Sequence, residues 1–455
     1  MNTENAYSIP QSVLDNLCEC YRENNCIRPE KYEHYPVKRG LRNSDGSGVM
    51  AGLTQISNVH GYVLDEGEKH PVEGTLVYRG MDINDLVSGC VADGRFGYEE
   101  TVWLLLFGKL PSAEQLEMFR ELLSEASELP PFFAEDMIIK APSPNIMNKL
   151  ARAVMALYSY DSDPDGLSLQ NVLRQSIQLI ARMPEITAYA YQVKRRHYDR
   201  QSMFFHPEQK GLSMAETVLY HLRPDAYYTP EEAHLLDICL MLHAEHGGGN
   251  NSTFAARVLS SSGTDTYSAM GAAIGSLKGP RHGGANIKVL QMLEHIKAGV
   301  KNWENDAEVR DFLVRLLRKQ EGDRSGLIYG MGHAVYTLSD PRAVILKKYA
   351  VDLAEQKGYG DEFRLLEAVE RLTPEVFAEV TGVEKVMCAN VDLYSGMVYR
   401  SLGITEDLFT PLFAVGRMAG WCAHRIEELM VGGRIIRPAY RAVQPRTPYV
   451  NLQER

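Results

Sequence analysis

The chain has 455 residues, 45% hydrophobic and 24% charged, a globular composition that predicts two or three domains or one large domain with an added lobe. With 48 basic and 59 acidic residues its net charge is −11, which argues against nucleic acid as a partner and requires that any anion site gather its cations locally. The seven cysteines form no zinc or disulfide pattern, the N-terminus lacks a targeting signature and no stretch approaches the roughly 20 apolar residues of a membrane span, so a cytoplasmic protein without membrane contact is expected.

The first part of the chain mixes short helix and strand signals. QSVLDNLCECYRE (11–23) can form a helix, and Pro-punctuated coil follows it. HGYVLD (60–65) and GTLVYRG (74–80) are rich in strand-forming residues and are separated by a polar stretch. This pattern predicts a small antiparallel pair.

Most of the remaining sequence predicts helix. Gly108 and Pro111 end an apolar run, and Ser112 is a suitable cap for the helix that follows. The expected helices are 99–111, 112–127, 231–246, 285–303 and 343–358. Since no alternating strand–helix rhythm and no repeat occurs, the sequence predicts an all-α protein with a minor β-hairpin.

Glycine-rich turns place histidines between these helices. His282 lies in GPRHGGAN, directly before a helix expected to begin near Ala285. The partial positive charge of a helix N-terminus disfavours imidazolium, so a neutral His282 would donate a hydrogen bond to a developing oxyanion. A histidine whose ring lies in solvent is the alternative.

His333 lies in YGMGHAVY, where Gly330 and Gly332 would let backbone N–H groups approach a ligand. In SDPRA, Asp340 is a plausible helix cap, which puts Arg342 in the first turn. A cation is disfavoured there, so a bound anion would explain Arg342. A flexible loop and a solvated arginine are the alternatives.

His243 and His246 lie in HAEHGGGN at a spacing that would put both on one helix face. A metal site is one interpretation, although no clear third ligand follows. Hydrogen bonding to a substrate or to the backbone is the preferred interpretation, and no metal is expected.

Three further charged residues lie toward the C-terminus. Asp392 stands between apolar neighbours after Asn390, either as an ordinary acid of a helix start or as a desolvated carboxylate that acts as a base. Arg417 lies in an apolar helical stretch where a charge needs a partner, and Arg437 lies in GRIIRPAYR. Two guanidinium groups would suit a small dicarboxylic acid.

In their order and spacing, HAEHGGGN, GPRHGGAN, GMGHAVYTLSDPRA, NVDLYSG and RIIRP resemble the active-site segments of the citrate synthase family. EGTLVYRGMDINDL and YEETVWLLLFGKLP resemble its early signatures, and the resemblance covers roughly residues 45–445. It implies a homodimer with a two-domain, mostly helical fold. The expected parts are an N-terminal extension (1–45), a large domain (46–282 and 394–455) and a small closing domain (283–393).

The resemblance also implies that acetyl-CoA condenses with oxaloacetate without a cofactor and that citryl-CoA is then hydrolysed. Asp392 would remove a methyl proton, His282 would stabilise the enolate and His333 would polarise the ketone of oxaloacetate. The oxaloacetate-binding positions are His246, Arg342, Arg417 and, from the partner subunit, Arg437. The CoA-binding positions are Leu327, Ile328, Tyr329, Gly330, Met331 and Gly332.

Two alternatives remain open besides the histidine metalloenzyme. 2-Methylcitrate synthase needs the same acid and base groups, because propanoyl-CoA adds only one methylene, worth about 1–3 kcal/mol in a pocket. A non-catalytic binding protein on the same scaffold is the other. The first 45 residues do not resemble the β-rich N-terminal domain of the hexameric, NADH-inhibited bacterial enzymes.

Overall fold

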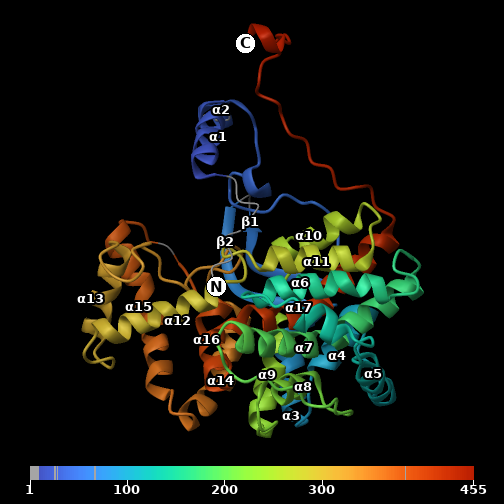
Figure 1. The fold of residues 1–455 in the computed structure, drawn as a ribbon. Helices are drawn as coiled ribbons and strands as arrows, with labels where there is room; N and C mark the ends of the chain where they lie inside the picture. The colour runs from blue at the N-terminus through green and yellow to red at the C-terminus, as the bar shows by residue number, and fades with distance from the viewer. Residues whose placement is uncertain (1–9, 25–26, 28, 66–67, 385) are drawn as a thin grey trace. The chain divides into compact units, whose positions relative to one another are not determined.

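The computed structural model describes residues 10–24, 27, 29–65, 68–384 and 386–455 (Figure 1). Contacts divide them into two compact units. One unit holds the described residues of Met1–Gly52 together with Arg437–Arg455, and the other is Leu53–Ile436.

The smaller unit pairs an N-terminal segment with the end of the chain. Its helices are α1 (Gln11–Asn24) and α2 (Glu30–His34), so the helix expected at 11–23 is confirmed. The ammonium group of Lys31 donates to the carbonyl of Val443 at 3.2 Å. These contacts join two segments that lie more than 400 residues apart in the sequence.

The larger unit begins with a small antiparallel sheet in the order β1-β2-β3. Its strands are β1 (Ser57–Asp65), β2 (Glu68–Tyr78) and β3 (Met81–Asp82). Ser57 pairs with Tyr78, and a bulge interrupts the register of β1 and β2 between His60 and Tyr62. The expected hairpin is confirmed, and the short third strand adds to it.

Helices make up most of the larger unit, which confirms the all-α fold class. Those before the His282 turn are α3 (Ile83–Ala92), α4 (Tyr98–Phe107), α5 (Ala113–Ala126), α6 (Ile146–Ala156), α7 (Leu169–His197), α8 (Met214–Leu222), α9 (Pro230–His243), α10 (Asn251–Ser260) and α11 (Thr266–Leu277). Those after it are α12 (Ala285–Gly299), α13 (Asp306–Leu317), α14 (Pro341–Gln356), α15 (Gly360–Thr381), α16 (Val391–Ser401) and α17 (Phe409–Val431).

The predicted helices form where their capping residues stand. Ser112 makes a reciprocal capping box with Gln115 at the start of α5, and Gly108 ends α4 in the left-handed conformation. On α12, Val289, Leu293 and Ile296 are fully buried, as their spacing predicts. Burial of each such side chain contributes about 1.5–3 kcal/mol.

The core gathers around α17, whose residues from Phe409 to Arg425 are buried. α17 packs against α4, α7, α9, α10 and α11, while α12, α14 and α15 pack against α16. The division into a large domain and a small domain that closes on it stays a prediction.

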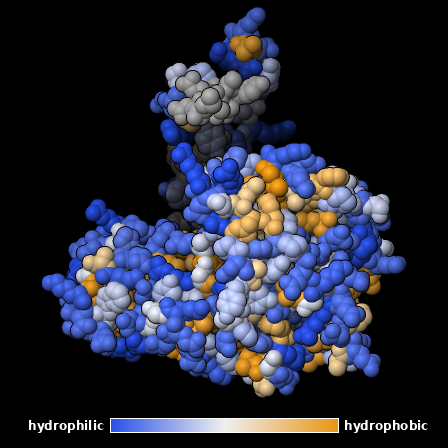
Figure 2. Space-filling view, turned by 60° about the horizontal axis from the view of Figure 1, so that its bottom comes forward, coloured by the Kyte–Doolittle hydropathy of each residue, from blue (hydrophilic) through white to orange (hydrophobic). Residues whose placement is uncertain are grey.

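No helix among the described residues is long and apolar enough to cross a membrane. The face in Figure 2 is mainly hydrophilic, with scattered apolar patches.

Candidate active site

The turn that follows α9 places two histidines in different surroundings. The prediction that they share a helix face is wrong, because α9 ends at His243 and His246 lies beyond it. His243 Nε2 lies 2.9 Å from the hydroxyl of Tyr399. The ring of His246 instead meets the ring of His333 edge-on at 5.3 Å. The two histidines thus contact different partners, Tyr399 and His333.

His246 presents a buried nitrogen without a partner. The residue is 9% exposed, and its Nε2 makes no hydrogen bond to the described residues. Burial, followed by the charges of Arg342 and other neighbours, holds its pKa well below the usual value, so the ring is neutral. An orphaned polar atom of this kind costs about 1–3 kcal/mol, which a bound ligand would relieve.

Arg417 brings a positive charge from the middle of α17 into the same place. It is fully buried, and its Nε donates to the carbonyl of His243 at 2.5 Å. Its Nη1 and Nη2 have no hydrogen-bond partner in the part of the chain that the structure describes. Burial lowers the pKa of the guanidinium to about 10, which leaves it charged at neutral pH. Two free donors on a buried cation suit a carboxylate that binds with both oxygens.

Arg342 occupies the first turn of α14, as predicted, but it has a protein partner. Its Nε and Nη2 contact the Asp340 carboxylate at 3.0 and 2.7 Å. Asp340 also caps the helix, since its Oδ1 accepts from the Arg342 amide at 3.0 Å. The ion pair therefore holds the arginine in one orientation. Of the guanidinium nitrogens, Nη1 is the one that does not contact Asp340.

His282 precedes α12, which begins at Ala285 as expected. Its Nε2 lies 3.3 Å from the amide nitrogen of Ser252 and 3.0 Å from the Ser252 hydroxyl. Because an amide N–H can only donate, Nε2 is an acceptor, and the neutral ring carries its proton on Nδ1. Burial, with the charge of Arg417, lowers the pKa of His282 to about 4. His282 is thus an uncharged donor at neutral pH.

His333 has the opposite tautomer. Its Nδ1 accepts from the backbone N–H groups of Val335 and Tyr336, both at 3.1 Å. The proton of the neutral ring therefore lies on Nε2. The ring stacks on Tyr336 at 4.6 Å, and these contacts fix the orientation of the donor.

The loop that carries His333 is tied to the start of α16. The Gly332 amide donates to the carbonyl of Cys388 at 2.7 Å, and the Asn390 amide donates to the carbonyl of Gly330 at 2.9 Å. Asn390 Nδ2 donates to the Gly332 carbonyl at 2.8 Å. A side chain at Gly330 would come within 2.8 Å of Leu393. Gly330 therefore allows the loop to pack closely against Leu393, whereas Gly332 has open space around it and a positive φ of 85°. The Gly332 N–H is engaged by Cys388, which differs from its expected exposure to a ligand.

Asp392 follows on α16, which Asn390 caps as predicted: the Asp392 amide donates to Asn390 Oδ1 at 3.0 Å. Burial raises the pKa of the Asp392 carboxyl to about 6, against the lowering influence of Arg342. A carboxyl with this pKa is ionised at neutral pH and is basic enough to accept a proton in catalysis.

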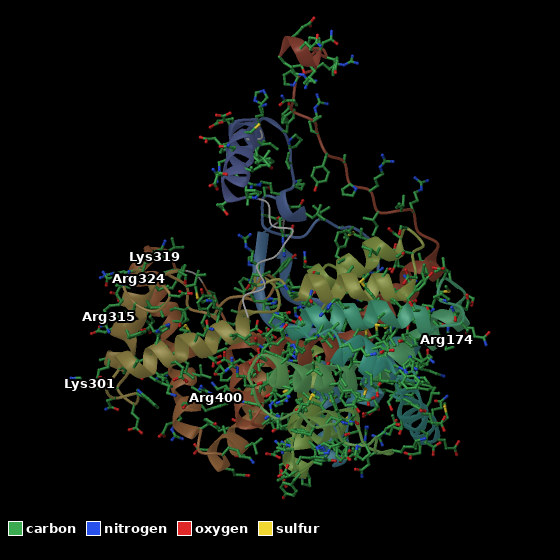
Figure 3. The ribbon with its side chains drawn as sticks, viewed as in Figure 1. Arg174, Lys301, Arg315, Lys319, Arg324 and Arg400 are labelled. Atoms are coloured by element: carbon green, nitrogen blue, oxygen red, sulfur yellow. The ribbon has the colours of Figure 1, made fainter. Side chains whose placement is uncertain are left out.

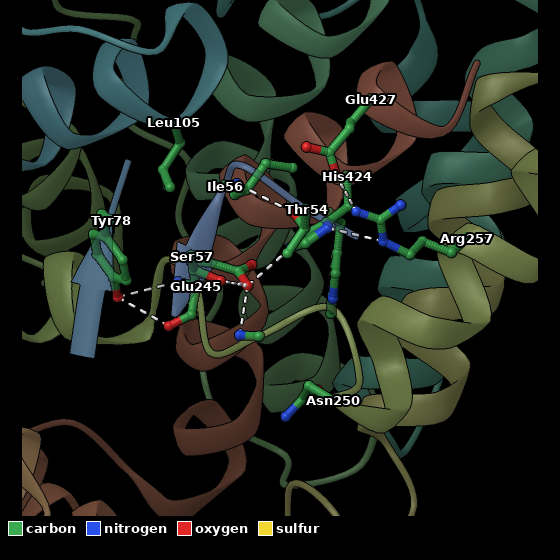
Figure 4. A network of polar contacts seen from close by, with 12 residues as sticks. Thr54, Ile56, Ser57, Tyr78, Leu105, Glu245, Asn250, Arg257, His424 and Glu427 are labelled. Atoms are coloured by element: carbon green, nitrogen blue, oxygen red, sulfur yellow. Dashed lines mark hydrogen bonds and ion pairs between the residues drawn. The ribbon is translucent and has the colours of Figure 1, made fainter. Parts of the chain in front are cut away.

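A buried network of charged and polar side chains around Glu245 supports the turn that carries His246 (Figure 4). Glu245 Oε1 accepts from the Gly247 amide at 2.6 Å, the Ser57 hydroxyl at 2.8 Å and His424 Nε2 at 2.9 Å. Arg257 Nε donates to His424 Nδ1 at 3.0 Å, so the proton of a neutral His424 lies on Nε2. Burial alone would raise the pKa of Glu245, but His424 and the hydrogen bonds lower it to about 2. The turn is thus anchored to an ionised carboxylate.

The segment expected to bind CoA is partly exposed. Leu327 is 55% exposed and Ile328 is buried, while the Tyr329 hydroxyl donates to Asp323 at 2.7 Å. Several basic side chains that precede this segment in the sequence lie around α12 and α13, as Figure 3 shows. They are Lys301, Arg315, Lys319 and Arg324.

Arg437 is exposed and belongs to the smaller unit, so its place in a site stays a prediction. The described residues contain no group of three histidine, cysteine or acidic side chains able to hold a metal. Glu245, Ser252 and the pairing of Asp340 were not anticipated from the sequence. Glu245 had a signal, because it is a charge directly after the apolar end of α9 and would need a partner if buried.

A family model described as "Citrate synthase, C-terminal domain" matches residues 44–439. The chain is 33% identical over 413 residues to a citrate synthase of Synechocystis, which covers 90% of this chain and 93% of that one. It is 32% identical over 405 residues to a 2-methylcitrate synthase of Shewanella oneidensis, which covers 88% and 94%.

Solved structures agree with this family. The crystal structure of citrate synthase from Pyrobaculum aerophilum has a TM-score of 0.74 at 30% identity and covers 92% of this chain and 95% of that one. The ternary complex of citrate synthase from Thermoplasma acidophilum with carboxymethyl coenzyme A and oxaloacetate has a TM-score of 0.73 at 25% identity and covers 92% of this chain and 99% of that one.

Proposed function

The chain belongs to the citrate synthase family and is a transferase that condenses an acyl-CoA with oxaloacetate, and we propose that it is specific for acetyl-CoA and releases citrate. The observation that carries the oxaloacetate part is Arg417, whose Nη1 and Nη2 are buried without a partner beside the orphaned Nε2 of His246. A small dicarboxylate would supply acceptors for both Arg417 nitrogens, and for His246 Nε2 in the tautomer that carries its proton there.

The proposed chemistry uses three groups in sequence. Asp392 takes a proton from the methyl group of acetyl-CoA while His282 Nδ1 donates to the thioester oxygen. The resulting enol attacks the ketone carbon of oxaloacetate, and His333 Nε2 supplies the proton to the ketone oxygen. Water then cleaves the citryl-CoA thioester to citrate and CoA.

The proton positions support these roles. The contacts of Ser252 to His282 and of the 335–336 amides to His333 place the proton of a neutral ring on Nδ1 of His282 and on Nε2 of His333. Neutral donors held in place require no reorganisation when charge develops on a carbonyl oxygen. Removal of one such group typically costs about 10²–10³ in turnover.

For CoA, we propose the segment Leu327–Gly332, with the phosphates near the basic residues around α13. Arg324 and Lys319 are exposed and precede this segment. Closure of the 283–393 region over the substrates would exclude water until hydrolysis.

We further propose a cytoplasmic homodimer in which Arg437 of one subunit reaches the site of the other. The similar citrate synthase of Thermoplasma acidophilum was solved with carboxymethyl coenzyme A and oxaloacetate bound together, which supports the pair of substrates proposed for this chain.

The deciding experiment is a free-thiol assay of CoA release with oxaloacetate and either acetyl-CoA or propanoyl-CoA. We expect a higher kcat/KM for acetyl-CoA. A clear preference for propanoyl-CoA would make the protein a 2-methylcitrate synthase, the reading that the Shewanella oneidensis relative favours. A folded dimer that bound oxaloacetate but released no CoA would be a non-catalytic binding protein.

A further inference from the structure

A cavity of about 620 Å³ lies among α5, α7 and α8, and none of the proposed catalytic residues lines it. Its volume falls within the roughly 300–1,000 Å³ of small-molecule sites. Apolar side chains form part of the wall, including Leu123, Pro184 and Met214. The cavity can therefore receive a small molecule with a hydrocarbon body.

Two buried polar atoms in the wall lack partners. Glu99 is 2% exposed, and its Oε1 accepts from the Met214 amide at 2.8 Å. Its other oxygen, Oε2, has no hydrogen-bond partner among the described residues, and neither has Nδ1 of His221, which is 4% exposed. Burial lowers the pKa of His221 to about 4, so Nδ1 of the neutral ring can accept a hydrogen bond. Burial raises the pKa of Glu99, and a cation at Oε2 would stabilise its ionised form.

The charge of the wall has one dominant sign. Seven glutamates line the cavity, against the cations Arg120 and Lys210. Arg120 is partly engaged, since its Nη2 donates to the Phe96 carbonyl at 3.0 Å. Glu185 is 9% exposed, and burial raises its pKa to about 7, with a further raising contribution from Glu208. A cationic guest would stabilise the ionised form of such a carboxyl, whereas an anion would be repelled.

We propose that this cavity is a binding site for a small alkylammonium ion, held by Glu99 and Glu185, with its hydrocarbon part against Leu123 and Pro184. An ammonium group brings three donors for the orphaned acceptors, and its short chain would fill the apolar wall. A divalent metal fits less well, because no metal-binding group of three ligands is found in the described residues.

The test is calorimetric titration of the full-length protein with 1,4-diaminobutane in 0.1 M NaCl, with 1-butanol as the uncharged comparison. We expect saturable binding of one diamine per chain and no detectable heat of binding for the alcohol. Absence of saturation up to 10 mM diamine would overturn the proposal, and so would equal binding of the alcohol.

Isosteric variants locate the site. Glu99→Gln keeps the Oε1 acceptor for the Met214 amide but removes the charge. Glu185→Gln removes the second charge, which lies on α7. Each should weaken diamine binding at least tenfold. Glu114→Gln, on the exposed face of α5 and away from the cavity, is the matched control and should leave the affinity unchanged.

If Glu99→Gln does not fold, Glu185→Gln carries the test alone. Diamine binding that is equally strong in the wild type and in both cavity variants would be adventitious attraction to an acidic surface, and it would refute the site. Because the readout is binding and not turnover, it is independent of the acyl-CoA specificity.

Discussion

The candidate active site and the cavity among α5, α7 and α8 both contain buried polar atoms without partners among the described residues, but the atoms differ in charge. The candidate active site holds the cationic donors Nη1 and Nη2 of Arg417 beside a histidine nitrogen, and the cavity holds a carboxyl oxygen of Glu99 and a histidine nitrogen of His221. A net charge of −11 spread over the chain would not predict either region. The difference shows that local burial and pairing decide which ligand charge a site accepts.

The two regions also differ in the contacts that support their functional side chains. In the candidate active site, Asp340 pairs with Arg342, and Glu245, next to His246 in the chain, accepts three hydrogen bonds. These contacts fix the orientation of Arg342 and of the turn that carries His246, which the proposed mechanism requires. In the cavity, Glu185 and Glu208 are like charges that oppose each other. Hydrogen-bonded support of the functional side chains therefore distinguishes the candidate active site from the cavity.

The largest expected effect tests whether the candidate active site is catalytic. Asp392→Asn should lower kcat by about two to four decades, because the variant has no base for the methyl proton. The substitution preserves the size of the side chain and leaves the Asn390 cap in place. The measurement is thiol release at saturating substrates, with Glu114→Gln as the control. A kcat within threefold of wild type would remove Asp392 from the mechanism.

Arg417→Met should produce the next largest effect. Loss of a buried charge pair with the substrate costs about 2–5 kcal/mol, so the KM for oxaloacetate should rise by about two to three decades. The melting temperature of the unliganded enzyme should hold or rise, since the variant removes a buried cation whose Nη1 and Nη2 have no partner among the described residues.

Arg342→Met is the matched comparison, because it leaves Asp340 buried without its partner. Breaking such a pair costs about 3–5 kcal/mol, so this variant should melt at a lower temperature than wild type. Both arginines should be required for oxaloacetate binding, yet their effects on stability should have opposite signs. Equal losses of stability would show that Arg417 has a partner in the unliganded enzyme.

The pH dependence provides a smaller effect of defined sign. Asp392 must be ionised to accept a proton, and its pKa is raised to about 6. The kcat/KM for acetyl-CoA should therefore fall by about tenfold per pH unit below 6 and level off above it. His282, with a pKa lowered to about 4, stays neutral across this range. A profile that is flat from pH 5 to 7 would contradict the raised pKa of Asp392.

Local signals in the sequence predicted much of the fold. Ser112, Asp340 and Asn390 each cap the helix that was expected to follow them, and Gly108 ends its helix. Capping depends on residues within one turn, so it can be read from the sequence. The short β3 was not expected, because two residues carry too little pattern.

The site was less accessible to sequence reasoning, because its contacts are long-range. The hydrogen bond from Asn390 to Gly332 spans 58 residues, and that from His424 to Glu245 spans 179. No periodicity encodes such pairs. The placement of His243 and His246 on one face failed because α9 ends one turn earlier than its apolar run suggests. Motif order indicated the site, but not the partners that orient it.

The smallest effect concerns that orientation. Glu245→Gln keeps an acceptor for the Gly247 amide, so the His246 turn should persist and the KM for oxaloacetate should change by less than about threefold. Glu245→Ala leaves Gly247, Ser57 and His424 without that acceptor, and a cost of about 1 kcal/mol should raise the KM several-fold. Turnover at saturating oxaloacetate should stay near wild type in both, because neither variant removes a reacting group. If the two variants raised the KM equally, charge and not hydrogen bonding would position His246.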